Sequence, residues 1–224
     1  GSEHGGADSS SVSSLLESNV VHVFTTDSAF AALKNDGSVV TWGDFDGDNN
    51  FSSVSSLLDS NVSHIYSTSK AFAALKDNGS VITWGNSSQG ADSSDVSNYL
   101  NSGVSKIFSN QFAFAALKND GSVITWGGQD SSSGDGGNSS AVANKLADGV
   151  IKIFSTKEAF AALKDDGSVV TWGDNDEGGD SSAVSNLLNS DVSHIYSTDT
   201  AFAALKEDGS VVTWGATPNG GDSS

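Results

Sequence analysis

The apolar positions of this chain recur in blocks that repeat almost without change. The block AFAALKNDGSVVTWG begins at Ala29, and near-copies begin at Ala71, Ala113, Ala159 and Ala201. Within the block, AFAALK is apolar on both faces and SVVTWG is rich in β-branched residues, which is typical of strands covered on both sides. A short polar turn that ends in glycine separates the two runs. The block therefore predicts an antiparallel hairpin with a bulged turn.

A further strand and a helical segment precede each hairpin. In the last copy, DVSHIYST from Asp191 is rich in β-branched and aromatic residues and predicts a strand. The segment GGDSSAVSNLLNS from Gly178 offers Asp180 or Ser181 as a helix cap, followed by apolar residues at helical spacing. This segment predicts one or two helical turns, with an irregular outer strand as the alternative. One unit is therefore three strands plus a short helical or irregular outer element.

Two residue types keep one place in every hairpin. Glycine ends each turn, because it alone adopts positive φ without steric cost. Tryptophan ends each third strand, and its constancy favours packing inside the repeat over the alternative, a sugar-stacking pocket. We assign structural roles to Gly37, Gly79, Gly121, Gly167 and Gly209 and to Trp42, Trp84, Trp126, Trp172 and Trp214.

The spacing of these tryptophans indicates the architecture. The steps are 42, 42, 46 and 42 residues, and repeats of roughly 40–50 residues are typical of β-propeller blades. We predict an all-β fold, a five-bladed β-propeller of five repeats of about 42 residues, in units of about 5–43, 44–85, 86–127, 128–173 and 174–215. Residues 1–4 are interpreted as a tag or tail remnant, 5–224 as a single propeller domain and 216–224 as its tail. A β-solenoid is the main alternative.

Composition narrows the possible partners. The formal net charge is −18 and all ten cations among Lys and Arg are lysines, so we expect no nucleic-acid partner, because phosphate binding needs a basic surface. No apolar run is long enough to cross a membrane, so we expect no membrane insertion. The chain has no cysteine, which removes disulfides and thiolate chemistry. The acidic, Ser- and Asp-rich surface suits an extracellular or cell-surface protein, and we expect a monomer.

The repeats resemble those of a known family. The pattern A-L-x-x-D/N-G-x-V-x-x-W-G, preceded by a strand such as VSHIYST and a segment such as VSNLL, is similar to the repeats of the regulator of chromosome condensation family. Those proteins are β-propellers that include a guanine-nucleotide exchange factor and many binding modules. Here Ala-Phe stands where the family has His-Ser/Thr, variants of GGDSS replace its Gly-Gln-Leu-Gly loop, and five units stand in place of the usual seven. The resemblance implies the fold, and we do not extend it to exchange activity.

Basic residues also recur, and each set has two interpretations. Lys34, Lys76, Lys118, Lys164 and Lys206 stand beside the acidic turn. They predict either local pairs with turn carboxylates or a ring that holds an anion. His22, His64 and His194 share one strand position with Lys106 and Lys152. A metal ligand or general base is not exchanged for lysine, so this position indicates a semi-exposed polar site rather than catalysis. We predict that the chain is not an enzyme.

One loop resembles half of a calcium site. Asp44, Asp46 and Asp48 lie at alternate positions in GDFDGDNNF, a spacing of oxygen ligands that suits Ca²⁺. The closing glutamate of a calcium loop is absent, since position 55 is serine. The alternative is a solvated turn. We expect no cofactor other than a possible Ca²⁺ ion at this loop.

Side chains that differ between otherwise identical units mark a candidate binding face. The short turns between first and second strands and the loops after each Trp-Gly pair vary most, and loops on a rigid scaffold commonly carry function. The candidate contacts are Phe45, Phe112, Asp27, Lys70, Gln111, Lys157 and Asp199. The sequence therefore favours a non-enzymatic binding or interaction module with a protein or glycan partner, as part of a secreted or surface adhesin or a glycan-binding propeller. The alternative is a structural scaffold, natural or engineered, without a small-molecule ligand.

Overall fold

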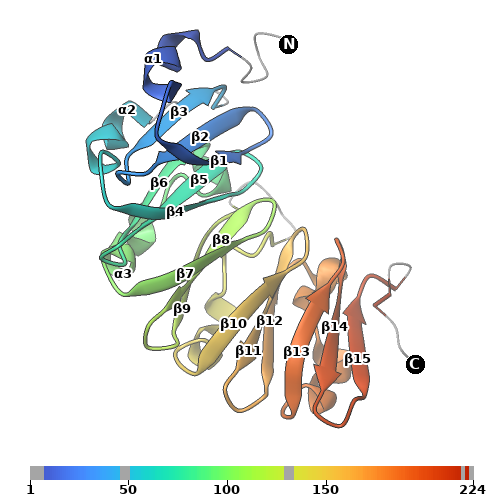
Figure 1. The fold of residues 1–224 in the computed structure, drawn as a ribbon. Helices are drawn as coiled ribbons and strands as arrows, with labels where there is room; N and C mark the ends of the chain where they lie inside the picture. The colour runs from blue at the N-terminus through green and yellow to red at the C-terminus, as the bar shows by residue number, and fades with distance from the viewer. Residues whose placement is uncertain (1–7, 46–50, 129–133, 218–219, 222–224) are drawn as a thin grey trace. The chain divides into compact units, whose positions relative to one another are not determined.

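The computed structural model describes residues 8–45, 51–128, 134–217 and 220–221 (Figure 1). Its strands are β1 (Val20–Thr25), β2 (Ala29–Lys34), β3 (Val39–Gly43), β4 (Val62–Ser67), β5 (Ala71–Lys76), β6 (Val81–Gly85), β7 (Val104–Ser109), β8 (Ala113–Lys118), β9 (Val123–Gly127), β10 (Val150–Ser155), β11 (Ala159–Lys164), β12 (Val169–Gly173), β13 (Val192–Ser197), β14 (Ala201–Lys206) and β15 (Val211–Gly215). Its helical segments are η1 (Ser10–Val12), α1 (Ser13–Leu16), α2 (Phe51–Val54), η2 (Ser55–Leu57), η3 (Ser87–Gln89), η4 (Ser94–Val96), α3 (Ser97–Leu100), η5 (Ser140–Lys145), η6 (Asn175–Gly179) and η7 (Ser182–Leu187). In the described part of the chain, no helix is long and apolar enough to span a bilayer.

The strands form five three-stranded sheets, in the orders β1-β2-β3, β4-β5-β6, β7-β8-β9, β10-β11-β12 and β13-β14-β15. Each sheet follows chain order, as expected for strands joined by tight turns. The predicted all-β fold of five repeated sheets is confirmed. The chain divides into two compact units, Gly1–Ile107 (unit 1) and Phe108–Ser224 (unit 2), which we describe separately.

The two pairings within a sheet differ in regularity. The second and third strands pair without interruption, so that Phe72 lies opposite Trp84 in unit 1. The first and second strands contain a bulge, because the register steps from Val62–Lys76 to His64–Leu75 and leaves Ser63 without an opposite residue. The Ser63 hydroxyl donates a hydrogen bond of 2.9 Å to the Leu75 carbonyl. The bulge is therefore partly stabilised by the side chain of the extra residue.

Each sheet has the same core, a phenylalanine stacked on the repeated tryptophan. The ring centroids lie 5.1–5.3 Å apart in Phe30–Trp42, Phe72–Trp84, Phe114–Trp126, Phe160–Trp172 and Phe202–Trp214. In unit 2 the Trp214 indole N–H also donates to the Gly178 carbonyl at 3.0 Å. Stacking and this bond satisfy both the apolar and the polar part of the indole. These tryptophans are core residues, and only Trp42 among them is partly exposed.

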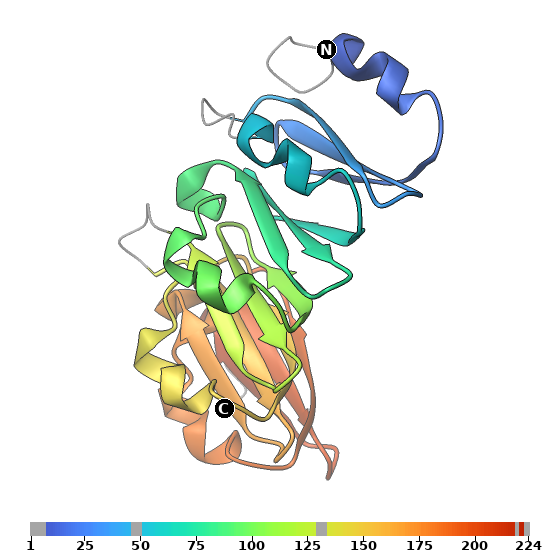
Figure 2. The same cartoon turned by 90° about the vertical axis from the view of Figure 1, so that its left-hand side faces the viewer.

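The segment before each first strand is helical, which excludes the irregular strand that the sequence also allowed. In unit 2, η7 packs against β15 of its own sheet and buries Leu188, and η5 does the same against β12 with Leu146. Figure 2 shows these helical turns at the rim of their sheets. Asp180, one residue before the N-cap Ser181, accepts a hydrogen bond of 2.8 Å from the Ser182 backbone. The helical segment is therefore the fourth, outer element of the sheet that follows it in the chain.

Candidate functional site

Each sheet has two ends with different chemistry. We call the end that carries the turns between second and third strands the hairpin end. The opposite end, which we call the turn face, carries the short turns between first and second strands and the loops that follow each Trp-Gly pair.

The hairpin end is held by its repeated side chains. Asp36 Oδ1 accepts hydrogen bonds from the Ser38 hydroxyl at 2.7 Å and the Ser38 backbone at 3.0 Å, and these bonds lower the pKa of the Asp36 carboxyl. The Gly37 carbonyl then accepts a bond of 3.0 Å from the backbone of Val62, in the next repeat. The turn glycine therefore has a second function besides its positive φ: it joins one repeat to the next.

The repeated lysines have a role that the sequence did not reveal. Lys34 Nζ donates to the Leu15 carbonyl at 3.0 Å, and Lys206 Nζ donates to the Leu187 carbonyl at 2.8 Å. Lys164 makes the same bond to the Lys145 carbonyl at 3.1 Å. Each of these carbonyls lies at the end of a short helical segment, where helix carbonyls lack an internal partner. These lysines thus tie the outer element to the sheet.

The turn face is held mainly by its backbone. In unit 1 the Asp27 N–H donates to the Ser69 carbonyl at 2.8 Å. In unit 2 the Gln111 N–H donates to the Lys157 carbonyl at 3.0 Å, and the Lys157 N–H donates to the Asp199 carbonyl at 2.7 Å. Neighbouring turns are therefore linked without using the side chains that differ between repeats. Asp27, Lys157 and Asp199 are exposed, whereas Lys70, Gln111 and Phe112 are partly buried.

One predicted contact on this face is wrong. Phe45 is 7 % exposed and packs edge-to-face on Phe72, with ring centroids 6.5 Å apart, as part of the core of unit 1. The Phe45 ring lies in a polar loop but packs against the next sheet. It is therefore unavailable to a partner. Phe112 remains partly exposed and stays a candidate.

The proposed calcium loop lies mostly outside the described residues. Asp46 and Asp48 belong to the segment 46–50, which the structure does not describe. Asp44 is described, and its backbone N–H donates to the Ser28 carbonyl at 2.9 Å. Within the described ranges, no group of three His, Cys, Asp or Glu side chains is arranged to hold a metal ion.

Acidic groups gather on the turn face of unit 2. Burial raises the pKa of Glu177, and the nearby carboxylates Glu158, Asp174 and Asp199 raise it further, while Lys157 opposes them. Lys157 Nζ lies 3.4 Å from Glu158 Oε1. This group comes from loops of two neighbouring repeats, and it offers carboxylate oxygens that accept hydrogen bonds from hydroxyl or ammonium donors.

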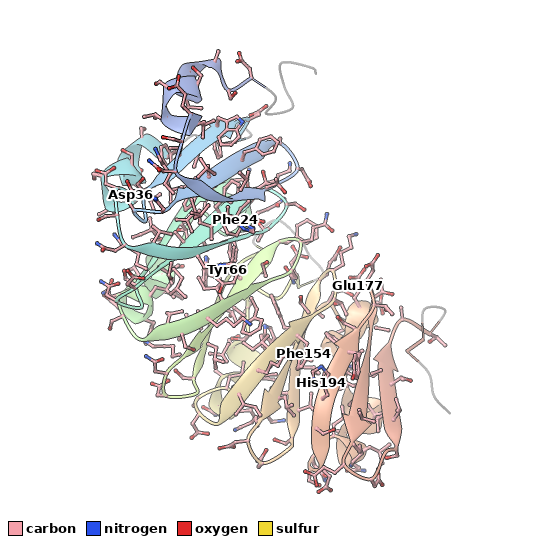
Figure 3. All side chains as sticks on the ribbon, viewed as in Figure 1. Phe24, Asp36, Tyr66, Phe154, Glu177 and His194 are labelled. Carbon is pink, nitrogen blue, oxygen red and sulfur yellow. The ribbon has the colours of Figure 1, made fainter. Side chains whose placement is uncertain are left out.

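A second feature lies on the first strands, and sequence analysis underestimated it. Each first strand carries a basic residue followed two positions later by an aromatic one: His22 and Phe24, His64 and Tyr66, Lys106 and Phe108, Lys152 and Phe154, His194 and Tyr196. We call these five pairs the first-strand ladder. Figure 3 shows Phe24 and Tyr66 along the first strands of unit 1, and Phe154 and His194 along those of unit 2. The signal was the basic-x-aromatic pattern, which holds in every repeat although histidine and lysine alternate.

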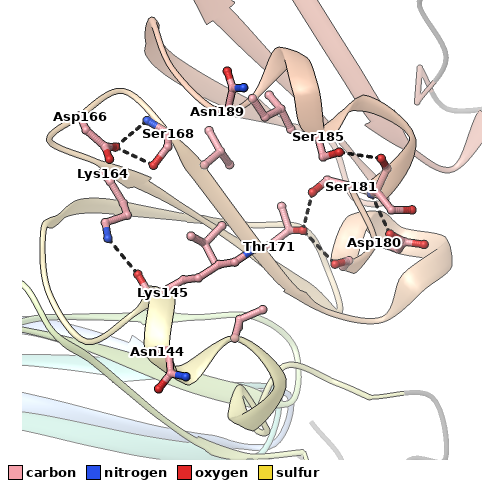
Figure 4. A pocket seen from close by; sticks show the side chains of 16 residues that line it. Asn144, Lys145, Lys164, Asp166, Ser168, Thr171, Asp180, Ser181, Ser185 and Asn189 are labelled. Carbon is pink, nitrogen blue, oxygen red and sulfur yellow. Dashed lines mark hydrogen bonds between the residues drawn. The ribbon is translucent and has the colours of Figure 1, made fainter.

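A groove of about 800 Å³ lies in unit 2 between η5 and η7 (Figure 4). Several of its hydroxyls are already engaged: Thr171 Oγ1 donates to the Gly179 carbonyl at 2.9 Å, and Ser185 Oγ donates to the Ser182 carbonyl at 2.9 Å. Val170 and Leu188 form its apolar part. These hydroxyls are engaged within the chain, and we assign the groove no ligand.

Comparison with known proteins bears on the fold. No family model matches the chain, and no curated protein sequence matches it. Among solved structures, yeast RCC1 (Prp20) bound to Kap60 matches with a TM-score of 0.53 and 17 % identity, over 88 % of this chain and 56 % of that one. Prp20p from Saccharomyces cerevisiae matches with a TM-score of 0.52 and 16 % identity, over 89 % of this chain and 57 % of that one. The chain thus spans little more than half of these structures. Their likeness and the five three-stranded antiparallel sheets together show an all-β fold of five RCC1-like β-propeller repeats.

Proposed function

We propose that this chain is a non-enzymatic binding module of a secreted or cell-surface adhesin, and that it binds a glycan through the turn face. The observation that carries the proposal is the backbone linkage of the turns. Because the bonds from Gln111 to Lys157 and from Lys157 to Asp199 are made by backbone atoms, the side chains of this face can change without loss of the scaffold. A surface whose side chains can vary without loss of the scaffold is suited to recognising a partner.

The chemistry of the face in unit 2 supports a glycan. Exposed Asp199 and Lys157 and the partly buried Gln111 offer both acceptors and donors for sugar hydroxyls. The partly exposed ring of Phe112 offers an apolar surface beside them. Such a mixture of a few directed polar groups and one aromatic surface is typical of small-ligand sites.

The fold neighbours support an interaction role in general terms. One of the matched structures is a complex of yeast RCC1 with Kap60, and the other is of Prp20p, a protein that binds Gsp1p and histones. Because their sequence identity to this chain is low, their likeness shows a shared fold and not a shared partner. We assign no catalytic residue, and the alternative function remains a scaffold without a small-molecule ligand.

A printed glycan array with two matched variants tests the proposal. The variant D27S/D199S removes one turn-face carboxylate from each unit, and D77S/E207S removes one exposed carboxylate per unit at the hairpin end. Both lower the negative charge equally. We expect glycan signals for the natural chain, a strong loss for D27S/D199S and little change for D77S/E207S. Absence of any signal for the natural chain supports the scaffold alternative instead.

A further inference from the structure

The first-strand ladder differs from its surroundings in charge. The chain carries 28 Asp and Glu against 10 Lys, yet all five ladder positions that precede an aromatic residue are His or Lys. Five lysines are used at the hairpin position, so the ladder holds a large part of the remaining basic side chains. This row of positive or protonatable groups is a locally basic region in a chain whose net charge is −18.

The ladder side chains are ordered by contact with each other. In unit 1, the Phe24 ring lies between His22, 4.4 Å away, and His64 of the next sheet, 5.0 Å away, and His64 lies 4.6 Å from Tyr66. In unit 2, Lys152 Nζ lies 4.7 Å from the Phe154 ring centre. Phe154 then meets His194 at 5.1 Å, and His194 meets Tyr196 at 4.7 Å. Basic and aromatic groups therefore alternate along a continuous row within each unit.

The row is accessible and lies on strands at the edge of their sheets. His22, His64, Lys106 and Lys152 are exposed, and Tyr196 is 58 % exposed. Ammonium and imidazolium N–H groups favour a negatively charged ligand, and the partly exposed rings beside them offer an apolar surface. Large aromatic side chains in contact with one another and also exposed to solvent indicate a surface that a partner covers.

We propose that the row of ladder residues within each unit binds a linear acidic polysaccharide, with its carboxylates on the basic residues and its sugar rings against the aromatic ones. This proposal extends the binding function proposed above to a second surface, and it rests on that function. A row that repeats the same pair of groups matches a polymer that repeats the same unit, in which each sugar presents an apolar ring face and an anion together. A peptide of mixed sequence lacks this regularity. A nucleic acid needs many permanent cations, and the ladder has two lysines.

The histidines make the expected binding depend on pH. His64 is exposed but partly covered by its neighbours, and this partial desolvation lowers its pKa; the neighbouring basic groups His22 on β1 and Lys106 on β7 lower it further. His64 is therefore largely neutral at pH 7.5 and gains its charge as the pH falls. Carboxylates of a uronate polymer stay ionised at about pH 5.5. Binding of the acidic chain should strengthen between these two values, because the bound anion favours the protonated imidazole.

The experiment measures binding of polygalacturonate to the full chain at pH 7.5 and pH 5.5, with dextran as the neutral polymer. We expect binding of polygalacturonate that is about three- to tenfold tighter at pH 5.5, and no comparable binding of dextran. K152Q should weaken binding about two- to threefold, while K145Q, which removes an exposed ammonium outside the ladder, should leave it unchanged. H22Q/H64Q should reduce the pH dependence.

Four results overturn the proposal. The first is equal binding of dextran, or no binding of polygalacturonate at pH 5.5. The second is an equal effect of K152Q and K145Q. The third is tighter binding of polyglutamate or of poly(dT), which would assign the ladder to a peptide or a nucleic acid. Loss of polygalacturonate binding in D27S/D199S, with the ladder variants unaffected, removes the ladder site and leaves the turn face as the binding surface.

Discussion

The two ends of each sheet are stabilised by different groups of atoms. At the hairpin end, the glycine, the lysine and an aspartate or asparagine recur because their own atoms make the bonds, as Asp36 does with Ser38 and Lys34 with Leu15. At the turn face, backbone atoms of neighbouring turns make the equivalent links, as between Gln111 and Lys157. The comparison teaches that a side chain is repeated in this molecule where it holds the structure, and differs where the backbone holds it.

The largest effect that we expect concerns the turn glycines. A Cβ on Gly167 would lie 2.7 Å from the backbone nitrogen of Asp191, whereas Gly209 has nothing within 4 Å among the described residues, although both have positive φ (+75° and +86°). G209A should cost about 1 kcal/mol of unfolding free energy for backbone strain alone. G167A should cost about 3 kcal/mol, because the contact adds overpacking. Urea unfolding followed by circular dichroism measures both, and equal losses contradict the joining role of Gly167.

The next effect tests the turn face, where a buried hydroxyl supports the backbone. Thr156 Oγ1 accepts a bond of 3.0 Å from the Ala159 N–H and donates one of 3.0 Å to the Glu177 carbonyl. T156V should cost about 1–2 kcal/mol, because both groups lose a buried partner. Thr198 makes the bond to the Ala201 N–H from an exposed position. T198V should therefore cost clearly less in the same unfolding measurement, since water replaces the hydroxyl.

A smaller effect depends on pH and compares two loops of the turn face. Glu177 and Gln89 occupy the same place, since the carbonyl of each accepts a bond from a threonine hydroxyl, Thr156 or Thr68. Burial raises the pKa of Glu177, so the folded chain holds this proton more tightly than the unfolded chain does. The associated stability is complete below the ordinary pKa of glutamate and is lost as the pH rises through the folded pKa.

E177Q should therefore raise the melting temperature at pH 7 by about 1–2 °C and have no such effect near pH 4. The reciprocal Q89E should lower the melting temperature at pH 7. Thermal melts of the two variants between these pH values check the sign. A stabilising effect of E177Q that is the same at both pH values would contradict the assigned protonation.

The smallest effect is expected for exposed side chains of the turn face. D27S/D199S should change the unfolding free energy by less than about 0.5 kcal/mol, because the bonds at these turns are made by the backbone. The control D77S/E207S should behave in the same way. A loss above about 2 kcal/mol in the first variant alone would show that these carboxylates are structural.

The repeated parts of the fold could be predicted from the sequence because each pattern that indicates them lies within a short stretch of the chain. Apolar and β-branched runs, the turn glycine and the Trp-Gly pair predicted the strands and hairpins. Phe45 was misplaced because its partner, Phe72, lies far along the chain on β5, and no local pattern records that contact. The lysine bonds were missed for the same reason, since Lys34 reaches back to Leu15. The exchange between histidine and lysine excludes a metal ligand or general base at the ladder position, but it leaves a basic surface, because both residues are basic.

The most direct test of the account is the melting temperature of a chain whose five short turns are made identical. Ser69-Lys70, Gln111-Phe112, Lys157-Glu158 and Asp199-Thr200 are each replaced by Asp-Ser, the pair found at Asp27-Ser28. If the backbone holds the turn face, this chain should melt within about 3 °C of the natural one. A fall of about 10 °C, as large as we expect for a clash at the hairpin end, would contradict the account.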